Sequence, residues 1–176
     1  MERATRPAVR PANPLSTIAR AGVVAGILDG LDAAIVLGVF GVGVKRVFQY
    51  IASGVLGPAS FQGGWLAAAL GVAFHFIVAI GAATTYYLLS RWFSILIRKP
   101  IFCGPIFGLG VFVVMRYVVI PLSAVPKPRP LVGWGLVNQL IAHTVLVGLS
   151  IGLIVARADG EAQRESAAPE RDRSRV

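Results

Sequence analysis

The chain has 176 residues, of which 56% are hydrophobic and 14% are charged. This composition excludes an ordinary soluble domain and predicts an all-α membrane protein. The formal net charge of +9 does not indicate nucleic-acid binding, because the basic residues of the tails are mixed with acidic ones and lack interleaved aromatic residues.

Four apolar segments approach the length of about 20 residues that a helix needs to cross a membrane. They cover residues 20–44, 64–90, 101–124 and 132–156, and we expect them to form a four-helix transmembrane bundle within residues 20–157. The flanking segments 1–19 and 158–176 are polar and charged, which predicts disordered tails. The first apolar segment is too long for a signal peptide and contains acids, so we expect it to be retained.

A shorter amphipathic segment, residues 46–57, separates the first two predicted spans. Its apolar residues follow a helical period, but glycines and Pro58 interrupt the region, so it is too short to span. These features predict an interfacial or re-entrant helix.

The basic residues predict the orientation. With a cytoplasmic N-terminus, twelve of the 17 lysines and arginines lie inside. They are Arg3, Arg6, Arg10, Arg20, Arg91, Arg98, Lys99, Arg157, Arg164, Arg171, Arg173 and Arg175, against Lys45, Arg46, Lys127 and Arg129 outside and Arg116 within a span. The positive-inside rule then places both termini in the cytoplasm, and we expect a bacterial inner (plasma) membrane.

Glycines spaced four residues apart recur in three of the predicted spans. Close backbone approach favours helix association in lipid, so we interpret these positions as packing faces. They are Gly22, Gly26 and Gly30, Gly104 and Gly108, and Gly148 and Gly152.

Ionisable residues inside a span are costly and normally face the bundle interior or a water-filled cavity. At 1.5 Å of rise per residue, Asp29 lies roughly 13 Å from the inner boundary, and His75 and His143 each lie roughly 16 Å from the outer one. We therefore predict a buried polar layer of Asp29, His75 and His143. Whether this layer is functional or only holds the bundle together stays open at this point.

A second polar layer is predicted nearer the outer side. Asp32 lies roughly 18 Å from the inner boundary, about 4.5 Å beyond Asp29 on the same helix face. Arg116, Asn138 and Gln139 lie near the same level. We predict an ion pair between Asp32 and Arg116, since an unpaired charge in hydrocarbon costs more than a satisfied pair.

The sequence leaves three interpretations of function. The first is small-solute or proton-coupled transport, or a subunit role in a membrane complex; a four-helix bundle is thin for a complete transport path, so we expect a homo-oligomer or a membrane-protein partner. The second is electron transfer by a b-type haem with His75 and His143 as axial ligands, with space at Gly71, Ala79 and Gly148. The third is a purely structural membrane partner.

An enzymatic role is not indicated, because the sequence contains none of the hydrolase, zinc-protease or phosphate-loop motifs. Cys103 is the only cysteine, so the chain offers no internal disulfide and no thiolate cluster for a metal. No metal or other cofactor is expected apart from the haem alternative.

Several motifs together resemble an uncharacterised family of bacterial four-helix inner-membrane proteins. They are GVVAGILD from Gly22, QYIASGVLG from Gln49, FQGG from Phe61, LGVAFHF from Leu70 and VVIPLSAVPKP from Val118. The resemblance covers residues 22–157 and implies the four-helix fold, but the family has no assigned activity and therefore implies no catalytic residue. In that family the second acid is not general, so Asp32 is expected to be particular to this chain.

Overall fold

The computed structural model describes residues 13–126 and 132–173, with side chains described as far as residue 166. These residues form helices and their connections, and four helical segments are long and apolar enough to cross a membrane. The predicted four-helix fold is therefore confirmed. The predicted tail residues 1–12 and 174–176, and Lys127 and Arg129 of the last connection, lie outside the described residues.

The first two membrane-length helices are α1 (Pro14–Val39) and α3 (Gly64–Trp92). Helix α1 begins six residues before the predicted span because Asn13 caps it: the Asn13 side-chain oxygen accepts hydrogen bonds from the backbone N–H groups of Leu15 and Ser16. Pro14 then occupies the first helical turn, where its missing N–H costs nothing. Part of the predicted N-terminal tail is thus helical.

The third and fourth membrane-length segments each change helix type along their length. The third, Pro100–Leu122, comprises α5 (Pro100–Val114), the π-helical η2 (Met115–Val119) and α6 (Ile120–Leu122). The fourth comprises α7 (Gly133–Ile141), the π-helical η3 (Ala142–Leu149) and α8 (Ser150–Arg173). A one-turn helix, α4 (Ile95–Arg98), connects α3 to α5.

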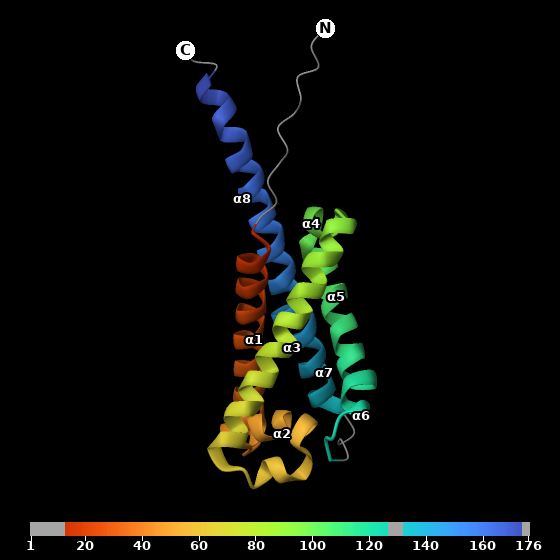
Figure 1. Cartoon of the computed structure of the whole chain (residues 1–176). Helices are drawn as coiled ribbons and strands as arrows, with labels where there is room; N and C mark the ends of the chain where they lie inside the picture. The colour runs from red at the N-terminus through yellow and green to blue at the C-terminus, as the bar shows by residue number, and fades with distance from the viewer. Residues whose placement is uncertain (1–12, 127–131, 174–176) are drawn as a thin grey trace.

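The segment between the first two spans forms α2 (Val44–Leu56) and the 3-10 helix η1 (Gly57–Phe61). Helix α2 lies across one end of the bundle, and α4 lies at the opposite end (Figure 1). A short helix between the first and second spans was predicted, and it is confirmed. The two ends of the bundle are called the α2 end and the α4 end below.

Helix α8 continues to Arg173, so the prediction of a disordered segment from residue 158 is wrong over the described residues. The segment after Arg157 is rich in Ala, Glu, Gln and Arg, which are strong helix formers. Within it, the Gln163 amide donates a hydrogen bond of 2.8 Å to Asp159, four residues earlier. Helix α8 consequently projects beyond the rest of the bundle at the α4 end (Figure 1).

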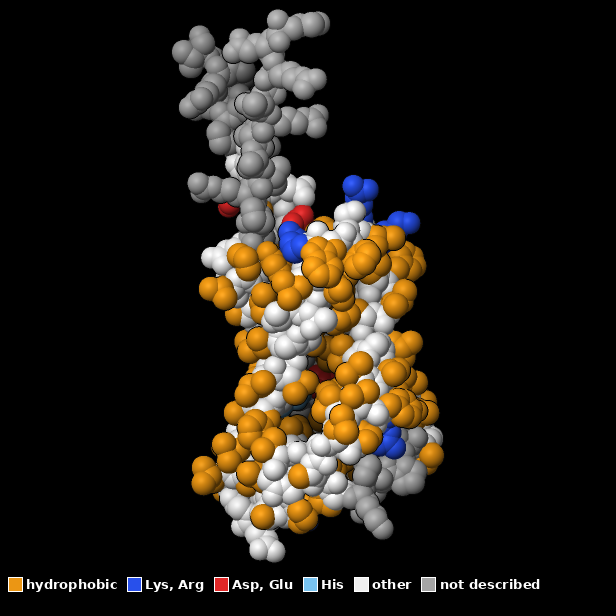
Figure 2. Space-filling view, turned by 45° about the vertical axis from the view of Figure 1, so that its right-hand side comes forward, with side chains coloured by type: hydrophobic (Ala, Val, Ile, Leu, Met, Phe, Trp, Pro, Cys, Tyr) orange, Lys and Arg blue, Asp and Glu red, His pale blue; other side chains and the backbone are white. Residues whose placement is uncertain are grey.

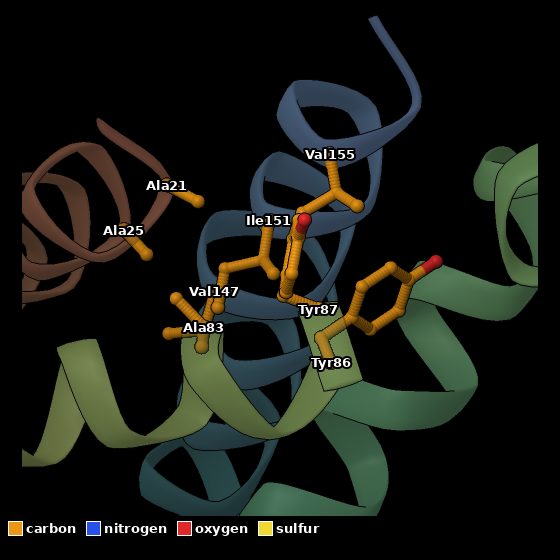
Figure 3. Close-up of a cluster of buried hydrophobic side chains, with 8 residues drawn as sticks. All are labelled: Ala21, Ala25, Ala83, Tyr86, Tyr87, Val147, Ile151 and Val155. Carbon is orange, nitrogen blue, oxygen red and sulfur yellow. The ribbon is translucent and has the colours of Figure 1, made fainter. Parts of the chain in front are cut away.

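The bundle has two tightly packed halves. Helix α3 packs against α1 and α2, α5 packs against η3 and α8, and α1 joins the halves through its contacts with η3 and α8. An apolar cluster lies where α1, α3, η3 and α8 meet (Figure 3). This core cluster consists of Ala21, Ala25, Ala83, Tyr86, Tyr87, Val147, Ile151 and Val155, all of them buried.

Close backbone approach holds the second half together. A Cβ atom added at Gly108 would collide with the carbonyl oxygen of His143, and one added at Gly148 would collide with the carbonyl oxygen of Gly104. In the first half, a Cβ on Gly22 would lie 2.7 Å from the Cα of Ile80. These contacts fit the interpretation of the spaced glycines as packing faces.

Two glycines on α5 allow a matched test of this packing. We expect Gly108→Ala to lower the free energy of unfolding by about 1–3 kcal/mol, because the new methyl group forces α5 away from η3. Gly110→Ala adds the same methyl group where nothing lies within 4 Å, so its stability should not fall. Thermal unfolding of the detergent-purified variants measures the difference, and equal midpoints would contradict the packing described.

Candidate functional site

A hollow opens at about mid-height of the bundle, and atoms of an acidic side chain are visible at its floor (Figure 2). Among the described residues, the acids other than those of α8 are Asp29 and Asp32, so the acidic atoms at this height belong to α1. Across the described residues, the backbone of α3 has few close approaches to α5 or η3, and α3 meets them through side chains of the core cluster and through Tyr86, toward the α4 end.

Asp29 and Asp32 lie on the inward face of α1. They follow Ala25 by four and seven residues, which is the spacing of one helix face. Ala25 is 0% exposed, whereas both aspartates are only half-buried. The cover over this face therefore ends between Ala25 and Asp29, and the two carboxylates lie where the bundle begins to open.

Asp32 is fixed by the fourth membrane-length segment. The amide of Asn138 in α7 donates a hydrogen bond of 2.8 Å to the Asp32 carboxylate. Asp32 and Asn138 had been assigned to one polar layer, and the structure brings these two residues together. Gln139, the next residue in that layer, is half-buried, and its backbone carbonyl accepts a hydrogen bond from His143.

Arg116 lies in η2 and is half-buried. It is close enough to Tyr50 of α2 to influence that phenol: partial burial raises the pKa of Tyr50, and the positive charge of Arg116 opposes the rise. The ion pair between Asp32 and Arg116 stays a prediction.

His75 ties α3 to α1. Its Nε2 lies 2.8 Å from the carbonyl oxygen of Gly26, and because a carbonyl only accepts, Nε2 carries the hydrogen and donates it. The imidazole also makes edge-to-face contacts with Phe48 and Phe76, at centroid distances of 6.4 and 5.6 Å. Gly26 and Gly30 leave the room that Phe76 and His75 occupy.

His143 forms its hydrogen bond within its own helical segment. Its Nδ1 lies 3.0 Å from the carbonyl oxygen of Gln139, so Nδ1 carries the hydrogen, and Phe112 packs edge-to-face against the ring at 5.6 Å. The Thr144 hydroxyl donates in the same way to Leu140, at 2.6 Å. Side chains thus bond to carbonyls of the turn that runs into the π-helical η3, a pattern that stabilises irregular helix in lipid.

The predicted layer of Asp29, His75 and His143 stays a prediction. His75 has its contacts with α1 and α2, whereas His143 has its contacts with α5 and its own helix. Among the described residues, Asp29 accepts no hydrogen bond and forms no ion pair within the distances that define them.

The geometry does not fit axial ligation of a haem by the two histidines. The Nε2 of His75 already donates to Gly26. The space expected at Gly71 is filled by the backbone of Phe48, and the space at Gly148 is filled by Gly104 and Gly108. No group of three or more His, Cys, Asp and Glu residues gathers as a metal site in the described part of the chain.

The sequence did not reveal the role of the tyrosines at the end of α3. Tyr86 and Tyr87 are 0% and 4% exposed. Tyr86 donates a hydrogen bond of 2.9 Å to the carbonyl of Leu96, and Arg91 forms an ion pair of 2.9 Å with Asp159. Only the helical extension beyond Arg157 places Asp159 within reach, and that extension was not predicted.

The four apolar helices and the short helix α2 define a multi-pass integral membrane protein with a polar hollow between its halves. Comparisons with protein-family models, with curated proteins and with solved structures find no match to the chain. The site must therefore be interpreted from its own chemistry.

A pair of double-mutant cycles tests the partners of Asp32. We expect the cycle of Asp32→Ala and Asn138→Ala to give a coupling energy of about 1–2 kcal/mol in unfolding measurements, because the hydrogen bond has a charged acceptor. The cycle of Asp32→Ala and Arg116→Ala measures the predicted ion pair in the same way. A coupling of zero with Asn138 would show that the hydrogen bond adds nothing to stability.

The haem alternative has an optical test. After expression with excess haem, we expect the purified protein to show no Soret absorption, since the Nε2 of His75 and the space near Gly71 and Gly148 are already occupied by protein contacts. A Soret band that disappears in both His75→Ala and His143→Ala would establish ligation by the two histidines.

Proposed function

We propose that the chain is a membrane transport protein that carries protons or a small solute coupled to protons, with Asp29 as the group that binds them. The observation that carries the proposal is the position of Asp29. It lies close to the middle of α1, on the inward face and at the hollow, and no described residue neutralises its carboxylate through an ion pair.

An isolated carboxylate at this depth is costly. A charge taken into hydrocarbon without a partner must be solvated by water, neutralised by a proton or accompanied by a cation. Asp32, three residues away, instead accepts the hydrogen bond from Asn138. The two acids therefore differ in chemistry: Asp32 is held by the protein, and Asp29 is available to a proton or a cationic solute.

His75 supports a relay of protons. Because its Nε2–H is engaged with Gly26, its Nδ1 is the nitrogen that accepts a proton in the neutral ring. The hydrogen bond from Nε2 to Gly26, which joins α3 to α1, therefore does not involve Nδ1. This property suits a histidine beside a transport path.

The rest of the proposal follows from the sequence. We propose that the protein lies in a bacterial inner membrane with both termini in the cytoplasm, so that the α4 end faces inward. A bundle of four helices encloses little space, and we propose that a second copy or another membrane subunit completes the path. The membership in the uncharacterised four-helix family stays a proposal that rests on the quoted motifs.

Proteoliposomes that contain a pH-sensitive dye test the role of Asp29. Under an imposed potential we expect the unaltered protein to move protons, and Asp29→Asn to reduce the rate by about tenfold or more, because an amide cannot exchange a proton. Asp29→Glu should keep much of the rate. Glu161→Gln makes the same acid-to-amide change at an exposed position of α8 and serves as the matched control.

Two results would contradict the proposal. One is proton movement by the unaltered protein no faster than in empty liposomes, with and without candidate solutes. The other is an undiminished rate in Asp29→Asn, provided that Glu161→Gln behaves like the unaltered protein.

A further inference from the structure

We infer that the α4 end of the bundle is a closed gate, formed by the core cluster, Tyr86 and the Arg91–Asp159 ion pair, which separates Asp29 from that side of the membrane. The inference rests on the proposed function, because a gate has meaning only if the hollow at Asp29 is a binding site. It adds the regulation of access to that site.

The first component of the gate is the apolar cover directly above Asp29. Ala21 and Ala25, on the same face of α1 and nearer the α4 end, are both 0% exposed. Ile151 and Val155 of α8 are buried in the same cluster, together with side chains of α3 (Figure 3). A layer of buried apolar side chains blocks the passage of water and ions in the conformation described.

Tyr86 of α3 is the second component, and it contacts α4, α5 and α8. It points away from α1 toward the neighbouring helices (Figure 3). Its hydroxyl donates to the carbonyl of Leu96 in α4, and its ring makes an edge-to-face contact with Phe107 of α5 at 5.0 Å. A Cβ atom on Gly152 would lie 3.0 Å from that hydroxyl, so α8 is in contact as well.

The third component is the ion pair at the surface of this end. Arg91 lies in the last turn of α3 and forms an ion pair of 2.9 Å with Asp159 of α8, and its guanidinium lies over the ring of Tyr87 at 4.8 Å. Helices α3 and α8 share few other contacts, so this pair and the tyrosines hold them together. The two side chains are 27% and 13% exposed, and a partly exposed pair of this kind breaks readily.

The opposite side of Asp29 has no equivalent cover. Away from the core cluster and Tyr86, the described residues of α3 have few close backbone approaches to α5 or η3, and the hollow lies at mid-height (Figure 2). The cover is therefore asymmetric about Asp29: the core cluster closes the bundle toward the α4 end, whereas Asp29 is half-buried at the hollow on the lateral face at mid-height (Figure 2). Passage of a solute requires separation of α3 from α8 at the closed end.

Cysteine accessibility tests the gate. The single native cysteine is removed by Cys103→Ser, and Asp29→Cys then carries the probe position in the full chain reconstituted in liposomes. A charged, membrane-impermeant methanethiosulfonate reagent is applied from each side in turn. Gln62→Cys and Ser94→Cys, at exposed positions of the α2 end and the α4 end, identify which side is which.

We expect Asp29→Cys to react from the side that labels Gln62→Cys, and about tenfold more slowly from the side that labels Ser94→Cys. Added Arg91→Ala or Tyr86→Ala should raise the slow rate by about fivefold or more, because each removes a contact of the closed state. Arg98→Ala, which removes a charge at the same end, is the matched control. The exchange Arg91→Asp with Asp159→Arg should restore the slow rate.

The remaining outcomes separate the two proposals. Fast labelling from the α4 side in the parent, or a slow rate that neither Arg91→Ala nor Tyr86→Ala changes, overturns the gate and leaves the site at Asp29 intact. Labelling from neither side shows that water does not reach Asp29, and this result overturns the proposed function as well. Unchanged labelling from the α2 side verifies that each variant is folded.

Discussion

The arrangement of this bundle depends on the close approach of two helix backbones at Gly104, Gly108 and Gly148. Lipid tails are as apolar as the side chains of the helices, so apolar burial provides little drive for helices to associate in a membrane. Backbone contact provides it instead, and a single added methyl group at Gly108 or Gly148 would collide with the facing backbone. The spacing of α5 and η3 is therefore fixed, and the backbone of α5 has few close approaches to that of α3.

The second constraint is that polar groups in hydrocarbon need internal partners. Most polar side chains of the spans meet it locally: Thr84 and Thr85 bond to carbonyls one turn earlier, and His143 does the same. His75 and Asn138 meet it between helices, and both contacts reach α1. The polar side chains thus fix how α1 sits against its neighbours. Among the described residues, Asp29 departs from this pattern, and it lies near the level beyond which the residues of α1 are half-buried or exposed.

The sequence predicts the spans, the short helix and the packing role of the glycines, because apolar length and small-residue spacing follow directly from the physics of the bilayer. It places Asp32 and Asn138 in one layer, because depth follows from the rise per residue. Depth does not determine which helices are neighbours, however, and for that reason the contacts of His75 with α1 and of His143 with α5 could not be foreseen. The ion pair of Arg91 could not be foreseen either, because it requires the helical extension of α8, where charge density suggested disorder.

The two aspartates of α1 lie three residues apart and differ in their contacts with the rest of the fold. Asp32 and Asn138 form a fixed contact between the two halves, so a proton or solute that used Asp32 would have to break the hydrogen bond that joins them. Among the described residues, Asp29 makes no such contact, so no hydrogen bond or ion pair of the described fold depends on its charge. A carboxylate can exchange a ligand many times only if the fold does not depend on its charge. Among the described residues, Asp29 meets this condition, whereas Asp32 is engaged in the contact that joins the halves, and the proposed exchange is therefore assigned to Asp29.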